Sequence, residues 1–249
     1  MSLPSLTTWA VPNMMFTDSP TRSASRLNAQ DLVSMRSALR LAPETRISHA
    51  SVSSKLKRTI DILGALVGLS ITGLILLPIA IVIQIDNPGK IFYSQIRCGV
   101  NGRPFRIWKF RSMVTNAESL KHLVKNEATG NIFKSKNDPR ITRVGKFLRR
   151  TSLDELPQFW NVLRGEMSLV GTRPPTVDEV KQYKPHHWRR LDVKPGITGE
   201  WQANGRSNVK DFEEIVAMDV EYQRKWSVMY DLTLIFKTIV AVLNKQGAC

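Results

Sequence analysis

The longest apolar run of the chain lies at residues 60–85, where the sequence reads IDILGALVGLSITGLILLPIAIVIQI. Asp61 is its only ionisable side chain. A helix of about 20 apolar residues is long enough to cross the hydrocarbon core of a bilayer, so the run predicts a membrane-associated helix. Pro78 lies within its second half, where a proline removes a backbone donor and bends the helix.

Positive side chains flank this run at both ends. They are Lys55, Lys57 and Arg58 before it, and Lys90 and Arg97 after it. Positive charge normally marks only the cytoplasmic end of a transmembrane helix. A helix that is broken at Pro78 and leaves the bilayer on the side where it entered satisfies both observations. We therefore expect a re-entrant membrane helix at residues 55–86; a plain transmembrane helix is the alternative that this stretch leaves open.

Shorter patterns predict a mixed domain after the membrane helix. The segments GKIFYSQIRCG and RPFRIWKFRSM alternate apolar and polar residues between the turn signals NPG and NG, which predicts a β-hairpin. Apolar positions on one face predict a helix from Asp154 to Leu163 that ends at Gly165. The last apolar stretch, WSVMYDLTLIFKTIVAVLNK, predicts a helix that covers the core or lies at the membrane interface. Residues 87–249 are therefore expected to form a compact α/β (α+β) domain.

Residues 1–54 differ from the rest of the chain because they are rich in Ser, Thr, Pro and Arg and contain no lysine. We interpret them as a mobile polar leader; a transit peptide is the alternative that this composition also fits. The whole chain carries 36 Lys and Arg against 21 Asp and Glu, a formal charge of +15. Acidic lipid headgroups, phosphorylated small molecules and nucleic acids all fit that charge. Two cysteines, Cys98 and Cys249, indicate a reducing compartment rather than a disulfide framework.

The segment RRTSLDELP places two arginines shortly before two adjacent carboxylates. The structural interpretation is a helix start: Ser152 and Glu155 have the spacing of a capping box, and Asp154 could itself cap a helix with Pro157 in its first turn. Capping and chemistry are compatible, because the positive end of a helix also attracts phosphate. The segment alone leaves both interpretations open.

Cations elsewhere in the chain favour chemistry at this helix end. They are Lys109, Arg111, Arg149, Arg150, Arg173 in TRPP and Arg206 in NGR. Arginine forks bind phosphate oxygens in pairs, and the proline and glycine turns hold Arg173 and Arg206 in place. A carboxylate beside phosphate-binding arginines predicts phosphoryl transfer through an acyl phosphate on Asp154. Glu155 would act as a base or help to hold Mg²⁺.

Four blocks of this sequence, in order and spacing, resemble the bacterial sugar transferase family of monotopic phosphoglycosyl transferases. They are KRTIDILGALVGL, GKIFYSQIRCGVNGRPFRIWKFRSM, DPRITRVGKFLRRTSLDELPQFWNVLRGEMSLVGTRPP and VKPGITGEWQANGR. The resemblance covers about residues 55–245. It implies a monotopic enzyme on the cytoplasmic face of the bacterial inner membrane. That enzyme transfers a sugar 1-phosphate from a UDP-sugar to polyprenol phosphate, usually undecaprenyl phosphate, and releases UMP in the first step of exopolysaccharide or other glycan assembly.

The resemblance also implies roles for individual residues. Asp154 would be the nucleophile and a ligand of Mg²⁺, with Glu155 as its partner. The phosphate and substrate site would take in Lys109, Arg111, Arg149, Arg150, Arg173, Arg206 and Asp219. The chain departs from the usual pattern at Leu77, where the family often has serine before the membrane proline, and at Glu166 and Thr172.

A non-catalytic basic membrane adaptor that binds acidic lipids or nucleic acid is the alternative from another class. It would need the charge and the membrane helix but not Asp154 beside Glu155. Nucleic acid is not an expected partner, because RITRVGKFLRR lacks interleaved aromatic residues. We expect His186 and His187 to be surface residues without a role, and Trp201 to approach the nucleotide. The identity of the sugar and the formation of a homo-oligomer stay open.

Overall fold

The computed structural model describes Val33, residues 48–133, 135, 137–204, 209 and 211–244. Its α-helices are α2 (Ala50–Ser53), α3 (Lys55–Asp86), α4 (Arg143–Arg150), α5 (Phe159–Leu163), α6 (Val177–Lys181), α7 (Glu200–Asn204), α8 (Phe212–Lys225) and α9 (Val228–Leu243). Its strands are β1 (Phe92–Cys98), β2 (Pro104–Phe110), β3 (Ser168–Val170) and β4 (Gly196–Thr198). Its 3₁₀ helices are η2 (Val100–Gly102), η3 (Lys121–Leu123), η4 (Leu153–Gln158) and η5 (Pro185–Leu191). The prediction of a mixed α and β domain is confirmed.

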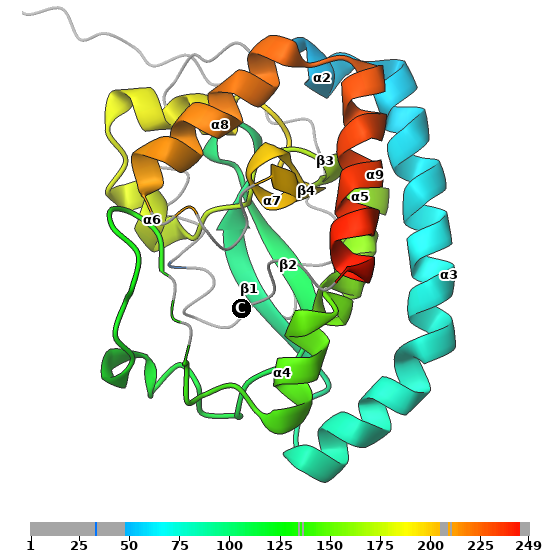
Figure 1. Cartoon of the computed structure of the whole chain (residues 1–249), viewed down its shortest axis with the longest axis vertical. Helices are drawn as coiled ribbons and strands as arrows, with labels where there is room; N and C mark the ends of the chain where they lie inside the picture. The colour runs from blue at the N-terminus through cyan, green and yellow to red at the C-terminus, as the bar shows by residue number, and fades with distance from the viewer. Residues whose placement is uncertain are drawn as a thin grey trace, which may run out of the picture.

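The helix α3 runs along one side of the molecule over its full height (Figure 1). Within the described part of the chain, it is the one helix long and apolar enough to cross a membrane. Pro78 lies inside α3, and the last turns bend toward α4 (Figure 1). The helix is not interrupted at Pro78 as expected, because a single helix extends from Lys55 to Asp86.

The first turns of α3 are held by polar contacts with the rest of the protein. Lys57 is 5% exposed, and its Nζ donates to the carbonyl of Val170 at 3.0 Å. Asp61 is 2% exposed and accepts hydrogen bonds from Ser168 Oγ at 2.8 Å and from the Leu169 N–H at 2.9 Å. These contacts bind α3 to all three residues of β3. Lys57 and Arg58 were both expected to flank the membrane. Both lie against the domain instead, because Lys57 donates to Val170 and Arg58 donates to backbone carbonyls of α5.

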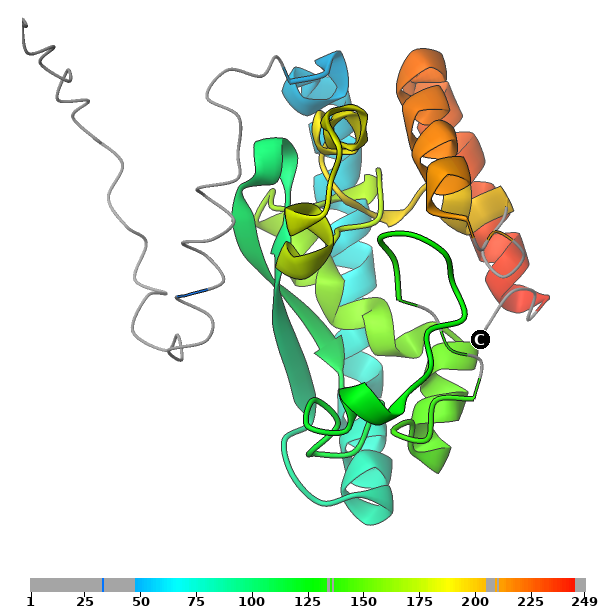
Figure 2. The ribbon, with the colours of Figure 1, turned by 90° about the vertical axis from the view of Figure 1, so that its left-hand side faces the viewer.

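The predicted hairpin is confirmed as β1 paired antiparallel with β2, in a register that sets Tyr93 opposite Lys109 and Arg97 opposite Phe105. A second, parallel pair joins β3 to β4. The hairpin and the α8–α9 pair lie on opposite sides of the molecule (Figure 2). Apolar clusters fill the space between the elements, and one of them joins Phe110 of the hairpin to Ile79 and Ile83 of α3 and to Leu148 of α4.

The last residues of the predicted leader pack onto the domain. The His49 N–H donates to the Asp192 carbonyl at 2.9 Å, and the His49 ring meets the Trp226 ring edge-on with centroids 5.6 Å apart. The docked chain therefore begins before residue 55. The rest of the predicted leader, apart from Val33, lies outside the described residues.

Candidate active site

Asp154 lies on η4, in a position set by apolar neighbours. Leu153 and Leu156 pack into the cluster that contains Ile79 and Ile83 of α3. This packing leaves Asp154 only 6% exposed. The carboxylate expected to react is therefore held against the apolar helix by the residues on both sides of it.

The expected start of the helix is wrong in its details. The segment forms η4, a 3₁₀ helix, and an α-helix begins only at Phe159. Ser152 has a φ of 56° and makes no side-chain capping bond. It follows Thr151, the C-cap of α4, and a left-handed residue at that position commonly ends a helix. Ser152 thus terminates α4 and turns the chain into η4, so the capping interpretation does not account for the carboxylates.

Glu155 forms an ion pair across the site with the hairpin. Lys109 Nζ lies 2.7 Å from Glu155 Oε1, and both side chains are 26% exposed. Pairs with such exposure contribute little to stability, so the contact mainly orients the two groups. The structure thus brings Lys109 and Glu155 together.

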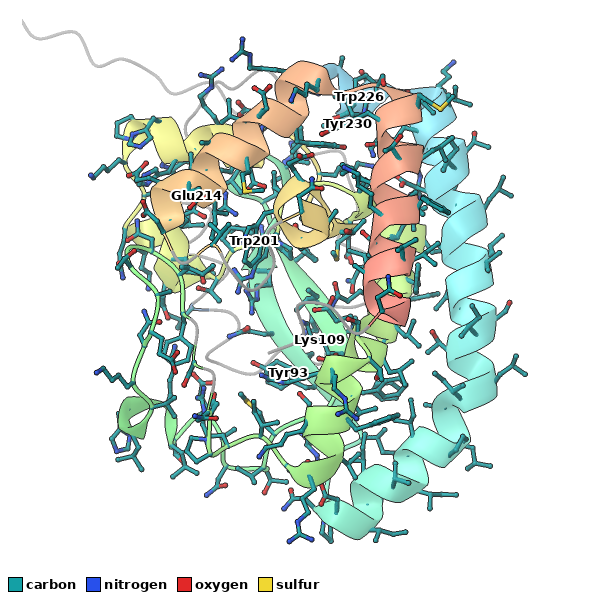
Figure 3. The ribbon with its side chains drawn as sticks, in the orientation of Figure 1. Tyr93, Lys109, Trp201, Glu214, Trp226 and Tyr230 are labelled. Carbon is teal, nitrogen blue, oxygen red and sulfur yellow. The ribbon has the colours of Figure 1, made fainter. Side chains whose placement is uncertain are left out.

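Tyr93 was missed by the sequence analysis. It lies directly opposite Lys109 in the hairpin, and Figure 3 shows the two side chains together on the same face of the hairpin. Partial burial raises the pKa of Tyr93, while the charges of Arg97, Arg140 and Arg149 oppose that rise. The signal that could have identified Tyr93 is the hairpin register, which follows from the NG turn.

The two arginines before the carboxylates face different surroundings. Arg149 Nε donates to Ser112 Oγ at 2.9 Å, just beyond the end of β2, whereas Arg150 is exposed. Arg111 is 8% exposed and donates to the carbonyls of Asn87 and Pro88. Its contacts indicate that it closes the turn between α3 and β1. A phosphate role for Arg111 and for Arg150 stays a prediction.

Arg173 and Asp219 belong to a charged cluster next to the last residues of β1. Arg173 NH1 lies 3.4 Å from the carboxylate oxygens of Glu179. Asp219 is 1% exposed and pairs with Arg190 Nε at 2.6 Å. Burial raises the pKa of Asp219 against the lowering effect of Arg190. Asp219 is therefore a buried partner of Arg190, and its expected place in the substrate site stays a prediction. Arg206 lies outside the described residues.

The two adjacent histidines are also placed differently from each other. His186 is exposed as expected, but His187 is 1% exposed, because its ring packs edge-on against Phe212. Their Nε2 atoms each lie 2.9 Å from an oxygen of Glu213. Nδ1 of His187 accepts the Lys184 N–H at 3.0 Å, so its proton lies on Nε2, where a metal would have to displace it. The group is a hydrogen-bonded clamp between η5 and α8.

Two departures from the usual family motifs have structural partners. Thr172 is 1% exposed, and its Oγ1 donates to the Arg190 carbonyl at 2.9 Å. Glu166 Oε2 accepts a hydrogen bond from Asn161 Nδ2 at 2.7 Å. Figure 3 shows Trp201 at a distance from Lys109 and Tyr93. Trp201 packs with Phe212 and Val216.

Comparison with known proteins shows which family the chain belongs to. A family model described as bacterial sugar transferase matches residues 52–245. The galactosyl transferase CpsE of Streptococcus agalactiae is 53% identical over 194 residues, which are 77% of this chain and 43% of that protein. The UDP-glucose:undecaprenyl-phosphate glucose-1-phosphate transferase of Escherichia coli is 43% identical over 197 residues, 76% of this chain and 40% of that protein.

The exopolysaccharide production protein ExoY of Rhizobium meliloti is 38% identical over 226 residues, which are 86% of this chain and 100% of that protein. The chain thus spans less than half the length of CpsE and of the Escherichia coli transferase, and it matches ExoY along all of that protein. With the family model matching most of its length, the chain belongs to the bacterial sugar transferase family.

Proposed function

We propose that this protein transfers a sugar 1-phosphate from a UDP-sugar to a polyprenol phosphate such as undecaprenyl phosphate, releases UMP and so initiates exopolysaccharide or other glycan assembly. The observation that carries this proposal is the position of Asp154, buried on a segment that packs against the apolar helix α3. One substrate dissolves in water and the other is anchored in lipid, so the reacting carboxylate has to lie at their boundary. The relative from Salmonella typhimurium, named undecaprenyl-phosphate galactose phosphotransferase, supports this reaction class.

The proposed reaction has two displacements at phosphorus. A carboxylate oxygen of Asp154 attacks the phosphorus next to the sugar, a P–O bond forms, and the bond to the bridging oxygen breaks. UMP leaves with that bonding pair. A phosphate oxygen of the lipid then attacks the same phosphorus, and the Asp154 carboxylate leaves as the sugar diphospholipid forms. Fixed cations next to the reacting phosphoryl group stabilise its charge without having to reorganise.

Glu155 and Lys109 have supporting roles in this reaction. Glu155 directly follows Asp154 in the chain. The 2.7 Å ion pair fixes the Glu155 carboxylate and holds the Lys109 ammonium on the hairpin face. In this position Lys109 contributes positive charge for the diphosphate. Glu155 is available to orient the incoming lipid phosphate or to accept its proton.

The donor set of this site fits Mg²⁺. The ion prefers carboxylate oxygens and usually keeps water and substrate phosphates as further ligands. Asp154 would hold it, with the carboxylate of the neighbouring Glu155 in the same turn of η4. When bound, Mg²⁺ neutralises negative charge on the diphosphate.

The membrane part of the proposal is a monotopic protein on the cytoplasmic face of the bacterial inner membrane. The apolar side chains Leu74, Leu77 and Ile85 of α3 are 81%, 70% and 79% exposed, and they would contact lipid. Its N-terminal turns are bonded to the domain through Lys57, Arg58 and Asp61. A helix held at one end outside the lipid and bent near the other favours re-entry over a crossing.

The transferase is tested against the basic adaptor by measuring UMP release. Full-length protein in detergent is incubated with Mg²⁺, undecaprenyl phosphate and a panel of UDP-sugars. The Asp154→Asn variant is compared with Asp178→Asn, a matched change at a carboxylate whose side chain is 71% exposed. We expect wild type and Asp178→Asn to release UMP equally and Asp154→Asn to lose about 10⁴-fold or more.

A second measurement examines the intermediate directly. Wild-type protein mixed with UDP-sugar alone and quenched in acid is expected to carry a phosphosugar on the peptide that contains Asp154, detected by mass spectrometry. UMP release that persists in Asp154→Asn would refute the covalent mechanism. No release from any donor sugar would favour the adaptor.

A further inference from the structure

Arg97, at the end of β1, makes contacts that its expected position beside the membrane does not explain. Its NH1 donates to the Pro174 carbonyl at 3.0 Å, and the neighbouring Cys98 N–H donates to the Pro175 carbonyl at 2.9 Å. Arg97 thus holds the turn that immediately follows Arg173. Its Nε is buried and makes no hydrogen bond within the described part of the chain.

The charges around Arg97 are not balanced within the part of the chain that the structure describes. Arg173 pairs with the single carboxylate of Glu179, and the charge of that carboxylate also acts on Arg97. That carboxylate is also used by the backbone, because the Thr176 N–H donates to Glu179 Oε2 at 2.6 Å. The nearby Arg190 already has its own partner in Asp219. Two guanidinium groups therefore share one carboxylate.

The surroundings of the two guanidinium groups favour an additional anion. Burial and the charge of Arg173 lower the pKa of Arg97 to about 10, so Arg97 stays protonated near neutral pH. Arg173 reaches Glu179 only at 3.4 Å, which is longer than the 2.7–2.9 Å typical of charge-assisted hydrogen bonds. Unused donors beside excess positive charge are what a phosphate group would satisfy.

The hairpin connects this cluster to the reacting carboxylate. Residues two apart in a strand point to the same face, so Tyr93 and Arg97 share one face of β1, and Lys109 lies opposite Tyr93. Their backbones are about 13 Å apart along the strand, but the charge of Arg97 acts on the Tyr93 hydroxyl, so the long Arg97 side chain spans part of that distance. The turn end of the hairpin, which follows Arg97 at the end of β1, lies away from the bent end of α3 (Figure 1), where Ile85 is highly exposed.

We infer that Arg97, together with Arg173, binds the nucleotide-side phosphate of the UDP-sugar, the phosphate that leaves as part of UMP. This inference rests on the proposed function, and it assigns the two directly bonded phosphates of the donor to adjacent positions: the phosphoryl group in transfer to Asp154, and the phosphate of the leaving nucleotide to Arg97 and Arg173. The lipid phosphate is the other source of the same chemistry. The water-facing end of the hairpin favours the nucleotide.

Binding of UMP tests the inference. Full-length protein in detergent is titrated with UMP by calorimetry, and the KM values for the UDP-sugar and for polyprenol phosphate are measured separately. The variants are Arg97→Gln and Arg97→Lys, and the control is Arg103→Gln, an exposed arginine at the hairpin turn. Loss of a charge-assisted contact is expected to weaken UMP binding roughly 10- to 100-fold in Arg97→Gln.

The expected pattern is a higher KM for the UDP-sugar, an unchanged KM for polyprenol phosphate and an unaffected Arg103→Gln. Arg97→Lys keeps a positive charge and a donor for Pro174 but lacks the fork, so it is expected to keep the wild-type melting temperature and still bind UMP more weakly. Wild-type UMP affinity in Arg97→Lys, or a raised KM for the lipid with UMP binding unchanged, would overturn the inference. A wild-type protein that binds UMP but releases none from any UDP-sugar would instead refute the proposed function.

Discussion

The buried ion pair between α3 and α9 allows a sharp prediction about what holds the membrane helix to the domain. Lys57 Nζ lies 2.6 Å from Asp231 Oδ2, with side chains 6% and 5% exposed. Asp231 also accepts hydrogen bonds from Tyr222 OH at 2.7 Å and from Trp226 Nε1 at 3.2 Å. The changes to be made are Lys57→Met, Asp231→Leu and the double variant.

The contacts determine how large each effect should be. Removing one partner of a buried ion pair leaves an uncompensated charge and costs about 3–5 kcal/mol. Lys57→Met leaves Asp231 with Tyr222 and Trp226 as donors. Asp231→Leu leaves Lys57 with the Val170 carbonyl and leaves Tyr222 OH with that same carbonyl at 3.3 Å. It also deprives Trp226 Nε1 of its acceptor, which adds about 1–3 kcal/mol. Asp231→Leu is therefore the more damaging change, and the double variant should recover part of the loss because no lone charge is left.

Thermal unfolding in detergent, followed by intrinsic fluorescence, measures these effects. For a domain of this size each kcal/mol lowers the melting temperature by roughly 2–4 °C, so Lys57→Met should lower it by about 6–20 °C. Lys55→Met, an exposed lysine at the start of the same helix, is the control and should have no measurable effect. Equal melting temperatures for Lys57→Met and Lys55→Met, or strictly additive losses in the double variant, would refute the reasoning.

Two further predictions concern packing and pH. A Cβ at Gly145 would lie 1.9 Å from the Ser112 carbonyl oxygen, so Gly145→Ala should displace α4 and cost about 1–3 kcal/mol. Gly73 has open space around it, so Gly73→Ala should not destabilise the protein in the same unfolding assay. Equal melting temperatures for the two variants would contradict this prediction. Hydrogen bonds from His186 and His187 lower the pKa of Glu213 from 4.5 to about 2. Its contribution to stability is therefore complete above about pH 4.5 and is lost as the pH falls toward 2. Glu213→Gln should reduce the drop in melting temperature between pH 5 and pH 3, and a profile identical to that of Glu214→Gln would count against the clamp.

The sequence by itself determined the elements whose signals are local. The alternation on both sides of the NG turn predicted the β1–β2 hairpin, and the apolar run predicted α3, because side-chain periodicity depends only on neighbouring residues. The Asp154–Glu155 pair and the family motifs also lie in continuous stretches. Lys109 could be assigned to the site from its motif, and the structure joins it to Glu155.

Only the tertiary structure decided which charged groups became buried and what they contact. Lys57 and Asp231 are 174 positions apart, and no local pattern marked Asp219 as a buried partner of Arg190 or Arg97 as the support of the turn after Arg173. The same limit explains why the α-helix expected from Asp154 begins only at Phe159, since a capping box and the left-handed end of α4 suit the same few residues. Burial of a charge depends on partners from distant segments, and those partners meet only when the chain has folded.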